Sequence, residues 1–397
     1  MFNISIEQKV LAKALEYLEP TVGKNALGLG DNCVSMRTTG NGSIEMYTTN
    51  TVEFTKLEAI VAVGGNTQEI APYVDFKRFK TIIMSIPENE VISLEANVND
   101  LFINFALKKT PIKLVGCTNG MIPLPTNQFP SSSMITVPKA FIKQATENVC
   151  SIITDSSSAP IYNCMRIYTT AMNVEVTAVD MTGKRTFAQT GTTTNNNPSQ
   201  DILIEASKLK KSLKLFEDYN EMELYMDANM VRIDGADIVA SYCQKTQGMI
   251  SGISYYSRRL NGAFPANIKA NFAPMPSEFS EINKEDIANC FTRIKAIEDQ
   301  TSGGIVAFEI DGNNVSVSMS SSYGNIEDTI TAENSISKTF RTMFKYENLN
   351  DIMKVIGTDT FEIGILPNHP SNYVIKQKGS DEIMFTIPGM AGTSATP

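Results

Sequence analysis

The sequence predicts an α+β fold in which three consecutive segments share one plan, with two helices packed on antiparallel sheets in each. Two sets of landmarks indicate the repeat. Hairpin turns are expected at Asn41, Asn173 and Asn313. The second helices are expected to begin near Asp75, Ser207 and Asn348. Because both sets recur at similar spacing, we expect three domains of one topology, at residues 1–130, 131–276 and 277–397.

The first segment is predicted to open with a helix over Ile6–Leu18, whose apolar face holds Leu11, Leu15 and Leu18. A hairpin turning at Gly40-Asn41-Gly42 follows, since Asn and Gly readily adopt the conformation of tight hairpin turns. The second helix is predicted over Asp75–Met84. Its apolar side holds Phe76, Phe79 and Ile83, and its basic residues are Lys77, Arg78 and Lys80.

The middle segment contains a dense run of lysines. Its first helix is predicted to begin at Pro138-Lys139, because proline is tolerated in a first helical turn, with an apolar face of Phe141, Ala145 and Val149. One face of the second helix, predicted over Ser207–Phe216, holds Leu209, Leu213 and Phe216. Another face holds Lys208, Lys211 and Lys214. A solvated face is the usual meaning of such a run, but its place in the repeat favours a basic surface shared between helices.

The third segment repeats the plan once more. We expect its first helix over Lys284–Ile297, a hairpin turning at Asp311-Gly312-Asn313 and a second helix over Asn348–Ile356. Strands at the end of each segment are expected to pair with the next segment and continue its sheet. A second copy of the chain would then remove the remaining open edges by symmetry.

The composition excludes several classes of protein. Of the 397 residues 42% are hydrophobic and the formal net charge is −9, which argues against a general nucleic-acid coating protein but leaves room for one basic surface. No apolar run approaches the roughly 20 residues that cross a bilayer, and the N-terminus lacks the apolar core of a signal peptide. The six cysteines are far apart in sequence, which indicates reduced, mostly buried thiols in a cytoplasmic protein.

A search for catalytic groups finds none arranged for chemistry. The only histidine, His369, lies in a predicted loop, so no Ser-His-Asp triad can be assembled away from that loop. No zinc-protease, cysteine-histidine or phosphate-binding loop motif occurs. Gly28 and Gly30 follow no strand, and Asp180 is explained by a turn between strands. We therefore expect a binding or scaffold protein that is not an enzyme and that holds no metal and no cofactor.

Four stretches resemble the bacterial sliding clamp, the β subunit of the replicative DNA polymerase. The N-terminal helix of that family and its following loop are similar to FNISIEQKVLAKALEYLEPTVGK. The family's "ATDGHRLA" turn resembles TAVDMTGKRTFA, and its "GRFPDY…P" linker resembles NGAFPANIKANFAP. The C-terminal strand pair ending in "MPMR" is similar to YVIKQKGSDEIMFTIPGM. The stretches occur in the family's order over nearly the whole chain.

The chain also departs from the family where partners bind. The family's "TLPIL" segment is replaced by NALGLGDN at Asn25–Asn32, and the turn histidine is replaced by Lys184. Thr186 precedes Phe187, and the chain ends in IPGM with the tail AGTSATP. These changes suggest a divergent clamp of phage or mobile-element origin whose partners carry a different peptide motif. The sequence leaves open whether the origin is bacterial or phage.

The resemblance implies a head-to-tail homodimer whose six domains form a ring around duplex DNA. Its partners would be double-stranded DNA of any sequence, a DNA polymerase and a clamp loader, with no membrane. Residues that would face the DNA are Lys24, Lys77, Arg78, Lys80, Lys143, Lys208, Lys211 and Lys214.

The resemblance also implies a peptide groove between the middle and last domains. It would be formed by Tyr162, Gly183, Arg185, Thr186, Phe187, Pro274, Ile387, Pro388 and Met390. For Phe187 and Ile387, plain core packing remains an alternative. The dimer interface would bring together Ile112 of the first domain and Ala296 and Ile297 of the third.

Two rival interpretations remain open. A non-enzymatic structural protein of repeated domains, such as a virion component, would explain the repeat but not the lysines on the second helices. An enzyme of unknown type would need a divalent-metal-dependent activity that the residue inventory does not suggest.

Overall fold

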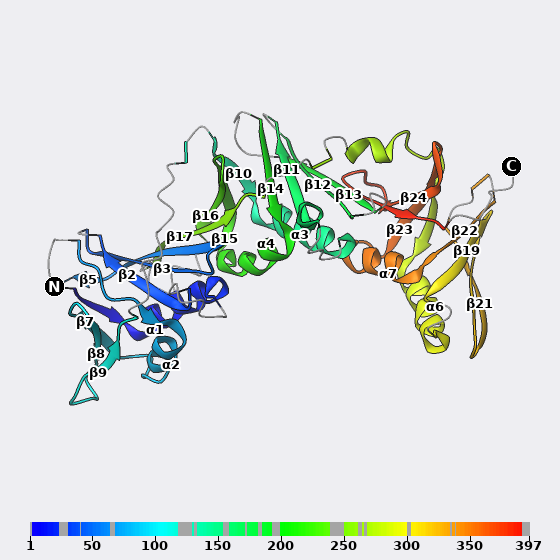
Figure 1. The fold of residues 1–397 in the computed structure, drawn as a ribbon. Coiled ribbons are helices and arrows are strands. Elements are labelled where there is room, and N and C mark those ends of the chain that lie inside the picture. The colour runs from blue at the N-terminus through cyan, green and yellow to red at the C-terminus, as the bar shows by residue number, and fades with distance from the viewer. Residues whose placement is uncertain are drawn as a thin grey trace. The chain divides into compact units, whose positions relative to one another are not determined.

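The structure, a computed structural model, shows the chain as two compact units (Figure 1). It describes residues 2–23, 31–39, 41–63, 68–117, 129–130, 133–153, 159–170, 173–181, 185–192, 199–238, 250–260, 264–265, 268–299, 303–333, 336–337 and 339–390. Unit 1 comprises Met1–Ala140, Thr193–Pro198 and Lys208–Arg259, and unit 2 comprises Phe141–Thr192, Ser199–Ser207 and Leu260–Pro397.

Unit 1 contains an eight-stranded antiparallel sheet in the order β10-β15-β16-β17-β4-β3-β2-β6. One half comes from the first segment, with β2 (Cys33–Thr38), β3 (Ser43–Thr49), β4 (Glu53–Ile60) and β6 (Val74–Asp75). The other half comes from the middle segment, with β10 (Ile135–Pro138), β15 (Tyr219–Met226), β16 (Met230–Ile238) and β17 (Ile250–Arg258). The halves join where β4 pairs with β17, which confirms that strands of successive segments continue one sheet.

The second sheet of unit 1 is five-stranded, in the order β5-β1-β7-β8-β9. Its strands are β1 (Asn3–Glu7), β5 (Ala62–Val63), β7 (Val91–Ala96), β8 (Asp100–Asn104) and β9 (Ile112–Val115). The helices of this unit are α1 (Gln8–Leu18), the short 3₁₀ turn η1 (Glu19–Thr21), α2 (Phe76–Met84), α4 (Ala206–Ser212) and the 3₁₀ helix η4 (Leu213–Phe216). The first two residues of α4 belong to unit 2.

Unit 2 repeats this design with an eight-stranded sheet in the order β14-β11-β12-β13-β25-β24-β23-β18. The middle segment contributes β11 (Cys164–Thr169), β12 (Asn173–Val179), β13 (Thr186–Thr192) and β14 (Gln200–Glu205). The third segment contributes β18 (Ser280–Asn283), β23 (Thr360–Leu366), β24 (His369–Gln377) and β25 (Ile383–Pro388). The two halves join where β13 pairs with β25.

A four-stranded sheet in the order β21-β20-β19-β22 completes unit 2. It consists of β19 (Ile305–Asp311), β20 (Asn314–Ser321), β21 (Gly324–Thr331) and β22 (Phe340–Lys345). The helices are α3 (Lys139–Ile152), whose first two residues belong to unit 1, α6 (Lys284–Ile297) and α7 (Tyr346–Val355). The short 3₁₀ helices are η3 (Pro160–Asn163) and η5 (Ile268–Phe272).

The predicted helices are confirmed with small shifts of their ends. α6 has the predicted bounds, and its first turn is capped by Asn283, whose side chain accepts a 2.8 Å hydrogen bond from the Glu285 backbone N–H. α2 begins one residue later than predicted because Asp75 is its N-cap, accepting from the Arg78 backbone N–H at 2.8 Å. The predicted apolar faces of α1 and α2 are buried, and α6 buries Ile287, Phe291 and Ile294.

Two details differ from expectation. The lysine helix is not continuous, because the backbone tightens from α4 into the 3₁₀ helix η4 at Leu213. In α3 the buried face includes Ile142, while Phe141 is only half-buried. Phe141 instead lies over Gly191 of β13, where a Cβ atom would come within 2.6 Å of its ring.

The boundaries of the three segments stay a prediction. The compact units do not follow them, because the middle segment gives strands to the large sheet of each unit. No helix in the described part of the chain is both long and apolar enough to cross a membrane. Among the described cysteines, Cys33, Cys164 and Cys290 are buried and Cys117 and Cys150 are half-buried, and all five are free thiols; Cys243 lies outside the described residues.

Candidate nucleic-acid interface and partner groove

α2 presents cations on the side opposite its buried face. Phe76, Phe79 and Ile83 are at most 3% exposed, so the helix is fixed to the body of unit 1. Lys77 and Arg78 are exposed, and within the described residues neither has a carboxylate at ion-pair distance. Lys80 differs, because its ammonium pairs with Glu19 at 2.8 Å. Among the described residues, Lys77 and Arg78 are therefore the cations of α2 that have no ion-pair partner.

The α4–η4 segment presents cations in the same way. Leu209, Leu213 and Phe216 are buried, as the sequence predicts. Lys211 and Lys214 are exposed and have no ion-pair partner among the described residues, whereas Lys208 is half-buried and has other interactions. Lys210 is also exposed, although the predicted basic face did not include it. Lys210, Lys211 and Lys214 follow the i, i+3, i+4, i+7 spacing of one helical face counted from Ser207, so this spacing favours Lys210 over the half-buried Lys208.

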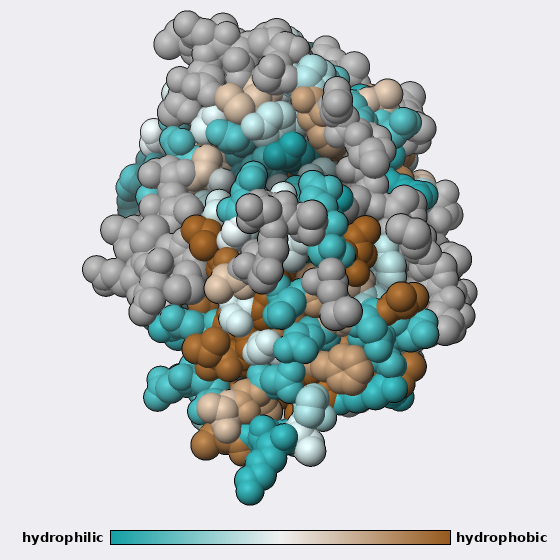
Figure 2. All heavy atoms as spheres, turned by 90° about the vertical axis from the view of Figure 1, so that its left-hand side faces the viewer, coloured by the Kyte–Doolittle hydropathy of each residue, from teal (hydrophilic) through white to brown (hydrophobic). Residues whose placement is uncertain are grey.

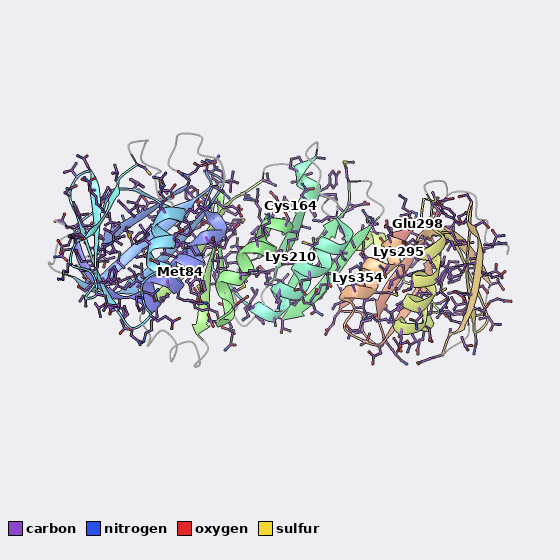
Figure 3. The ribbon with its side chains drawn as sticks, turned by 90° about the horizontal axis from the view of Figure 1, so that it is seen from below. Met84, Cys164, Lys210, Lys295, Glu298 and Lys354 are labelled. Carbon is purple, nitrogen blue, oxygen red and sulfur yellow. The ribbon has the colours of Figure 1, made fainter. Side chains whose placement is uncertain are left out.

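α1 connects these two basic elements. Its first residue, Gln8, donates from Nε2 to the carbonyl of Ile83 in α2 at 2.9 Å. Near its other end, the Tyr17 hydroxyl donates to the carboxylate of Asp218, directly after η4. The helices therefore form one connected surface of unit 1, and Figure 3 shows them with Met84 of α2 and Lys210 of α4 labelled.

Charge on this surface is concentrated on the second helices. The cations of α1 are matched locally, with Lys9 2.9 Å from Glu7 and Lys13 3.3 Å from Glu16. By contrast, α2 and α4–η4 present ammonium and guanidinium groups to solvent without such partners in the described region. In a chain of net charge −9, this part of unit 1 thus presents a concentration of cations without ion-pair partners among the described residues.

The helices of unit 2 carry fewer free cations. Lys143 of α3 and Lys295 of α6 are exposed without an ion-pair partner in the described residues. Lys354 of α7, labelled with Lys295 in Figure 3, pairs with Asp351 at 2.8 Å. Lys24, which the sequence also suggested, lies outside the described residues.

Of the three residues predicted for a dimer interface, one lies on the outer strand of a sheet and two lie at the end of a helix. β9, which contains the half-buried Ile112, pairs only with β8 and is the outer strand of its sheet. In unit 2, β21 is likewise an outer strand, and Arg293 of α6 binds its Asp328 at 2.8 Å. Ala296 is exposed and Ile297 is half-buried at the end of that helix.

Exposed apolar side chains accompany the edge in unit 1. Val91, Val98, Leu107 and Val115 are all more than half exposed on β7, β9 and the adjoining turns. Figure 2 faces the end of unit 1 that carries these strands and shows apolar side chains interspersed with polar ones over its lower part. An unpaired strand edge with exposed apolar residues is a typical site of association.

The pairing of β13 with β25 places some of the predicted partner residues, from two distant parts of the sequence, on neighbouring strands. Thr186 lies opposite Thr386, with their hydroxyls 2.8 Å apart, and Phe187 lies opposite Phe385 with ring centroids 5.2 Å apart. Pro388 ends β25, and beyond it the Met390 backbone N–H donates to the carbonyl of Met343 in β22 at 2.8 Å.

A buried ion pair joins Asp180, directly after β12, to Arg185, directly before β13. The Arg185 guanidinium donates from Nε to Asp180 at 3.0 Å, and the two side chains are only 17% and 5% exposed. The Arg185 backbone N–H also donates to this carboxylate at 3.2 Å, and Nη1 lies 3.4 Å from the side-chain oxygen of Asn348 in α7. Arg185 therefore links the end of β12 to α7.

Not every predicted groove residue is available to a partner. Thr186, Phe187 and Ile387 are fully buried, so they can act only as support beneath the surface. Tyr162, Arg185 and Pro388 are half-buried, and Pro274 and Met390 are exposed. Gly183 lies outside the described residues. The accessible part is thus smaller than the predicted set, and it extends to Met343, which is 41% exposed and which sequence reasoning missed.

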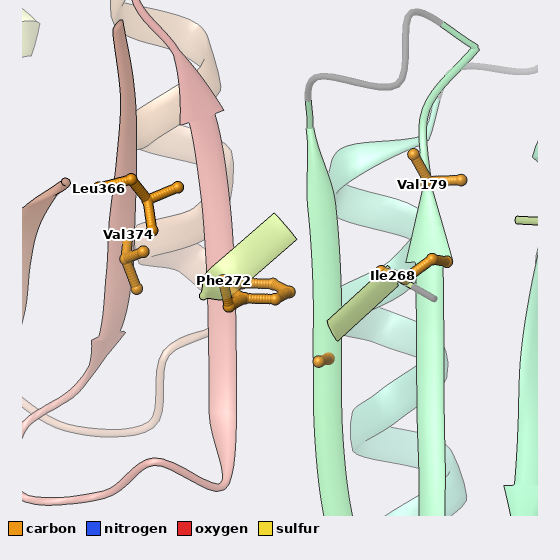
Figure 4. Close-up of a cluster of buried hydrophobic side chains, with 6 residues drawn as sticks. Val179, Ile268, Phe272, Leu366 and Val374 are labelled. Atoms are coloured by element: carbon orange, nitrogen blue, oxygen red, sulfur yellow. The ribbon is translucent and has the colours of Figure 1, made fainter. Parts of the chain in front are cut away.

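A hydrophobic cluster is formed by side chains of η5 and of strands β12, β13, β23 and β24. Figure 4 shows Val179, Ile268, Phe272, Leu366 and Val374 converging from the middle and third segments, with η5 between the strands. Tyr162, Met275 and Met384 pack against the cluster from its margin. The strands on which the groove residues lie are therefore held by a continuous apolar core. Within the described residues, no three His, Cys, Asp or Glu side chains are placed to hold a metal ion.

Comparison with known proteins identifies the fold. No protein-family model matches the sequence, and no curated protein matches it. Solved structures do match over nearly the whole chain. The beta chain of DNA polymerase III from Streptococcus pneumoniae TIGR4 is 16% identical, with a TM-score of 0.82 over 98% of this chain and 100% of that one.

The chain has the fold of the bacterial DNA polymerase sliding clamps. The sliding clamp of Bacillus subtilis is 14% identical, with a TM-score of 0.81 over 98% of this chain and 99% of that one. The Pseudomonas aeruginosa clamp bound to griselimycin is 12% identical, with a TM-score of 0.80 over the same shares.

The match to the clamp fold confirms the predicted α+β architecture of repeated clamp domains. None of these three structures is described as a virion component. Identity of 12–16% over the full length explains why the fold is recognised while no family model matches the sequence. The predicted phage or mobile-element origin stays a prediction.

Proposed function

We propose that this chain is a DNA sliding clamp, a non-catalytic processivity factor that encircles duplex DNA and tethers a polymerase in the cytoplasm. The observation that carries the proposal is the clamp fold over 98% of the chain, combined with cations that the second helices of unit 1 leave unpaired in the described residues. The fold supplies the geometry of a ring segment, and the free cations supply a surface for phosphates.

The charge pattern suits sliding better than tight binding. Lys77, Arg78, Lys211 and Lys214 are exposed groups that reach into solvent, so they can exchange phosphate partners without breaking fixed networks in the protein. Contacts to phosphates attract any sequence equally. Retention on DNA then depends on ring closure, while the net charge of −9 disfavours DNA binding elsewhere on the surface.

Ring closure would use the two open sheet edges. β9 of one copy would pair with β21 of the other, which removes both edges in a head-to-tail dimer. Ile112, Ala296 and Ile297 are proposed to lie at or beside this seam. In this arrangement neither copy keeps an unpaired outer strand at these positions.

Partners would bind beside β25. The half-buried Tyr162, Arg185 and Pro388 and the exposed Met343 and Met390 offer a shallow apolar surface for a short peptide of a polymerase or of a clamp loader. Phe187 and Ile387 would support that surface from the core.

The proposal is tested first by the mass of the protein in solution. Each chain has a mass of 43.6 kDa, so light scattering across a dilution series should give twice that value at high concentration. A chain that stays monomeric at every concentration would contradict ring formation by this protein alone.

A further inference from the structure

Two cysteines that are far apart in the sequence meet inside unit 1. The Sγ atoms of Cys33 and Cys117 are 2.7 Å apart, compared with about 2.05 Å in a covalent disulfide. Both residues are free thiols. They belong to different structural elements, since Cys33 begins β2 of the eight-stranded sheet and Cys117 follows β9 of the five-stranded sheet.

The backbone holds both residues against the same short segment. Cys33 pairs with Asp75 in the ladder between β2 and β6. The Cys117 backbone N–H donates to the carbonyl of Tyr73 at 2.6 Å, two residues earlier in that segment. The sulfur contact is therefore fixed by main-chain bonds on both sides and does not depend on rotamer choice alone.

Gly116 makes the close approach of Cys117 possible. Its backbone N–H donates to the carbonyl of Asn99 at 2.7 Å. A Cβ atom at this position would lie 2.7 Å from that oxygen and 2.8 Å from Cβ of Pro72, so a larger residue would displace the chain and separate the sulfurs. The sequence Gly116-Cys117 thus brings the end of β9 to Cys33.

The two thiols differ in accessibility. Cys33 is 2% exposed, whereas Cys117 is half-buried. Burial, and next the hydrogen bond with Cys117, raise the pKa of the Cys33 thiol. An oxidant therefore reaches Cys117 first, and Cys33 lies in contact with it as the resolving thiol.

We propose that Cys33 and Cys117 form an intramolecular disulfide when the protein meets a hydroperoxide oxidant, linking β9 to the eight-stranded sheet. The Cys117 thiolate attacks one peroxide oxygen, the O–O bond breaks, and the products are a sulfenic acid and hydroxide. The sulfur of Cys33 then attacks the sulfur of Cys117 and displaces the hydroxyl group, which leaves as water with the proton of Cys33. In total two thiols and one hydrogen peroxide give one disulfide and two waters.

The disulfide would stabilise unit 1 by closing a long loop. The two residues are 84 positions apart, and a crosslink over such a distance restricts the unfolded chain strongly. We expect the melting temperature of the oxidised protein to rise by roughly 5 °C or more relative to the reduced protein.

The experiment exposes the folded protein to hydrogen peroxide, blocks remaining thiols and maps the peptides without reduction. The expected result is a Cys33–Cys117 crosslinked peptide, reversed by dithiothreitol, together with the higher melting temperature. The variants C117A and C33A should lack both. The control is C290A, because the Cys290 Sγ contacts the carboxylate of Asp328 at 3.3 Å, whereas Cys33 and Cys117 contact each other.

Each possible result either supports or overturns the proposed disulfide. If the C33A variant folds poorly, the C117A variant alone tests the proposed disulfide. Cys117 is half-buried, so its replacement disturbs little of the core. Oxidation of Cys117 to sulfinic acid without a crosslink would overturn the proposal, as would a crosslink between two chains. A melting temperature that rises equally in wild type and C117A would show that peroxide acts elsewhere.

Discussion

Removing two lysines from the α4–η4 segment tests the proposed channel surface with little risk to folding. Lys211 and Lys214 are exposed and have no ion-pair partner in the described residues, while the segment is held by Leu209, Leu213 and Phe216. Replacing both lysines with glutamine should therefore change the free energy of unfolding by less than about 0.5 kcal/mol per site.

The expected effect on DNA binding follows from the number of phosphate contacts. Each contact contributes about 0.9 to the slope of log K against log salt concentration, so the K211Q/K214Q variant should lose about 1.8 from that slope. Over a fourfold rise in salt, wild type should then lose roughly tenfold more affinity than the variant. Equilibrium binding to a short duplex, followed by fluorescence anisotropy across a salt series, measures both slopes.

A matched control removes the same charge from another part of unit 1. Lys108 and Lys109 are exposed in the segment between β8 and β9 and belong to no helix. The K108Q/K109Q variant should keep the wild-type slope, provided that its mass in solution shows an intact dimer. Equal slopes for the two double variants would remove α4–η4 from the DNA surface and leave its lysines as an ordinary solvated face.

Three further predictions concern the seam, the groove and its ion pair. I297D should give a monomer by light scattering, because an unpaired charge in a desolvated seam costs several kcal/mol; a dimer of unchanged strength would place the interface elsewhere. Deleting residues 391–397 should leave polymerase stimulation intact, whereas a deletion that begins at Pro388 and removes Met390 should abolish it and keep the dimer; loss of the dimer as well would mean that the segment is core. D180N should destabilise the protein by about 1.5–3 kcal/mol in urea unfolding, because it removes the charge that compensates Arg185; an unchanged midpoint would show that the pair contributes nothing.

Local features were predictable because their causes are local. The hairpin turn at Gly312-Asn313 follows from residue types that tolerate positive φ, and Gly312 has a φ of 58°. The bounds of α6 follow from its apolar spacing and from Asn283 at the N-cap. Such signals lie within a few residues of one another, so the sequence shows them directly.

Features that depend on distant contacts were not predictable in detail. Sequence patterns indicated that segments would pair, but they could not show that β13 meets β25 with Thr186 opposite Thr386, about half the chain away. Nor could sequence patterns distinguish the predicted partner residues that are exposed from those that are buried. Phe187 is apolar whether it contacts a peptide or Phe385, and only the fold shows that it is fully buried.

Arg185 illustrates the same limit for a charged residue. Its position in a turn suggested contact with a partner, whereas the structure places its guanidinium against Asp180 and Asn348. Lys210 illustrates the reverse error, because it is exposed on α4 while the predicted Lys208 is half-buried.

The measurement that tests the central claim most directly is retention on closed compared with linear DNA. The protein is diluted to monomers, reconcentrated with a nicked circular duplex, and passed over a sizing column in high salt, which suppresses contacts to phosphates. A topologically linked ring should co-elute with the circle and should be released when a single restriction cut linearises the DNA. The K211Q/K214Q variant should behave in the same way, because closure and not charge retains the ring. Co-elution that persists after the cut, or that never occurs at concentrations where the dimer is complete, would contradict the account.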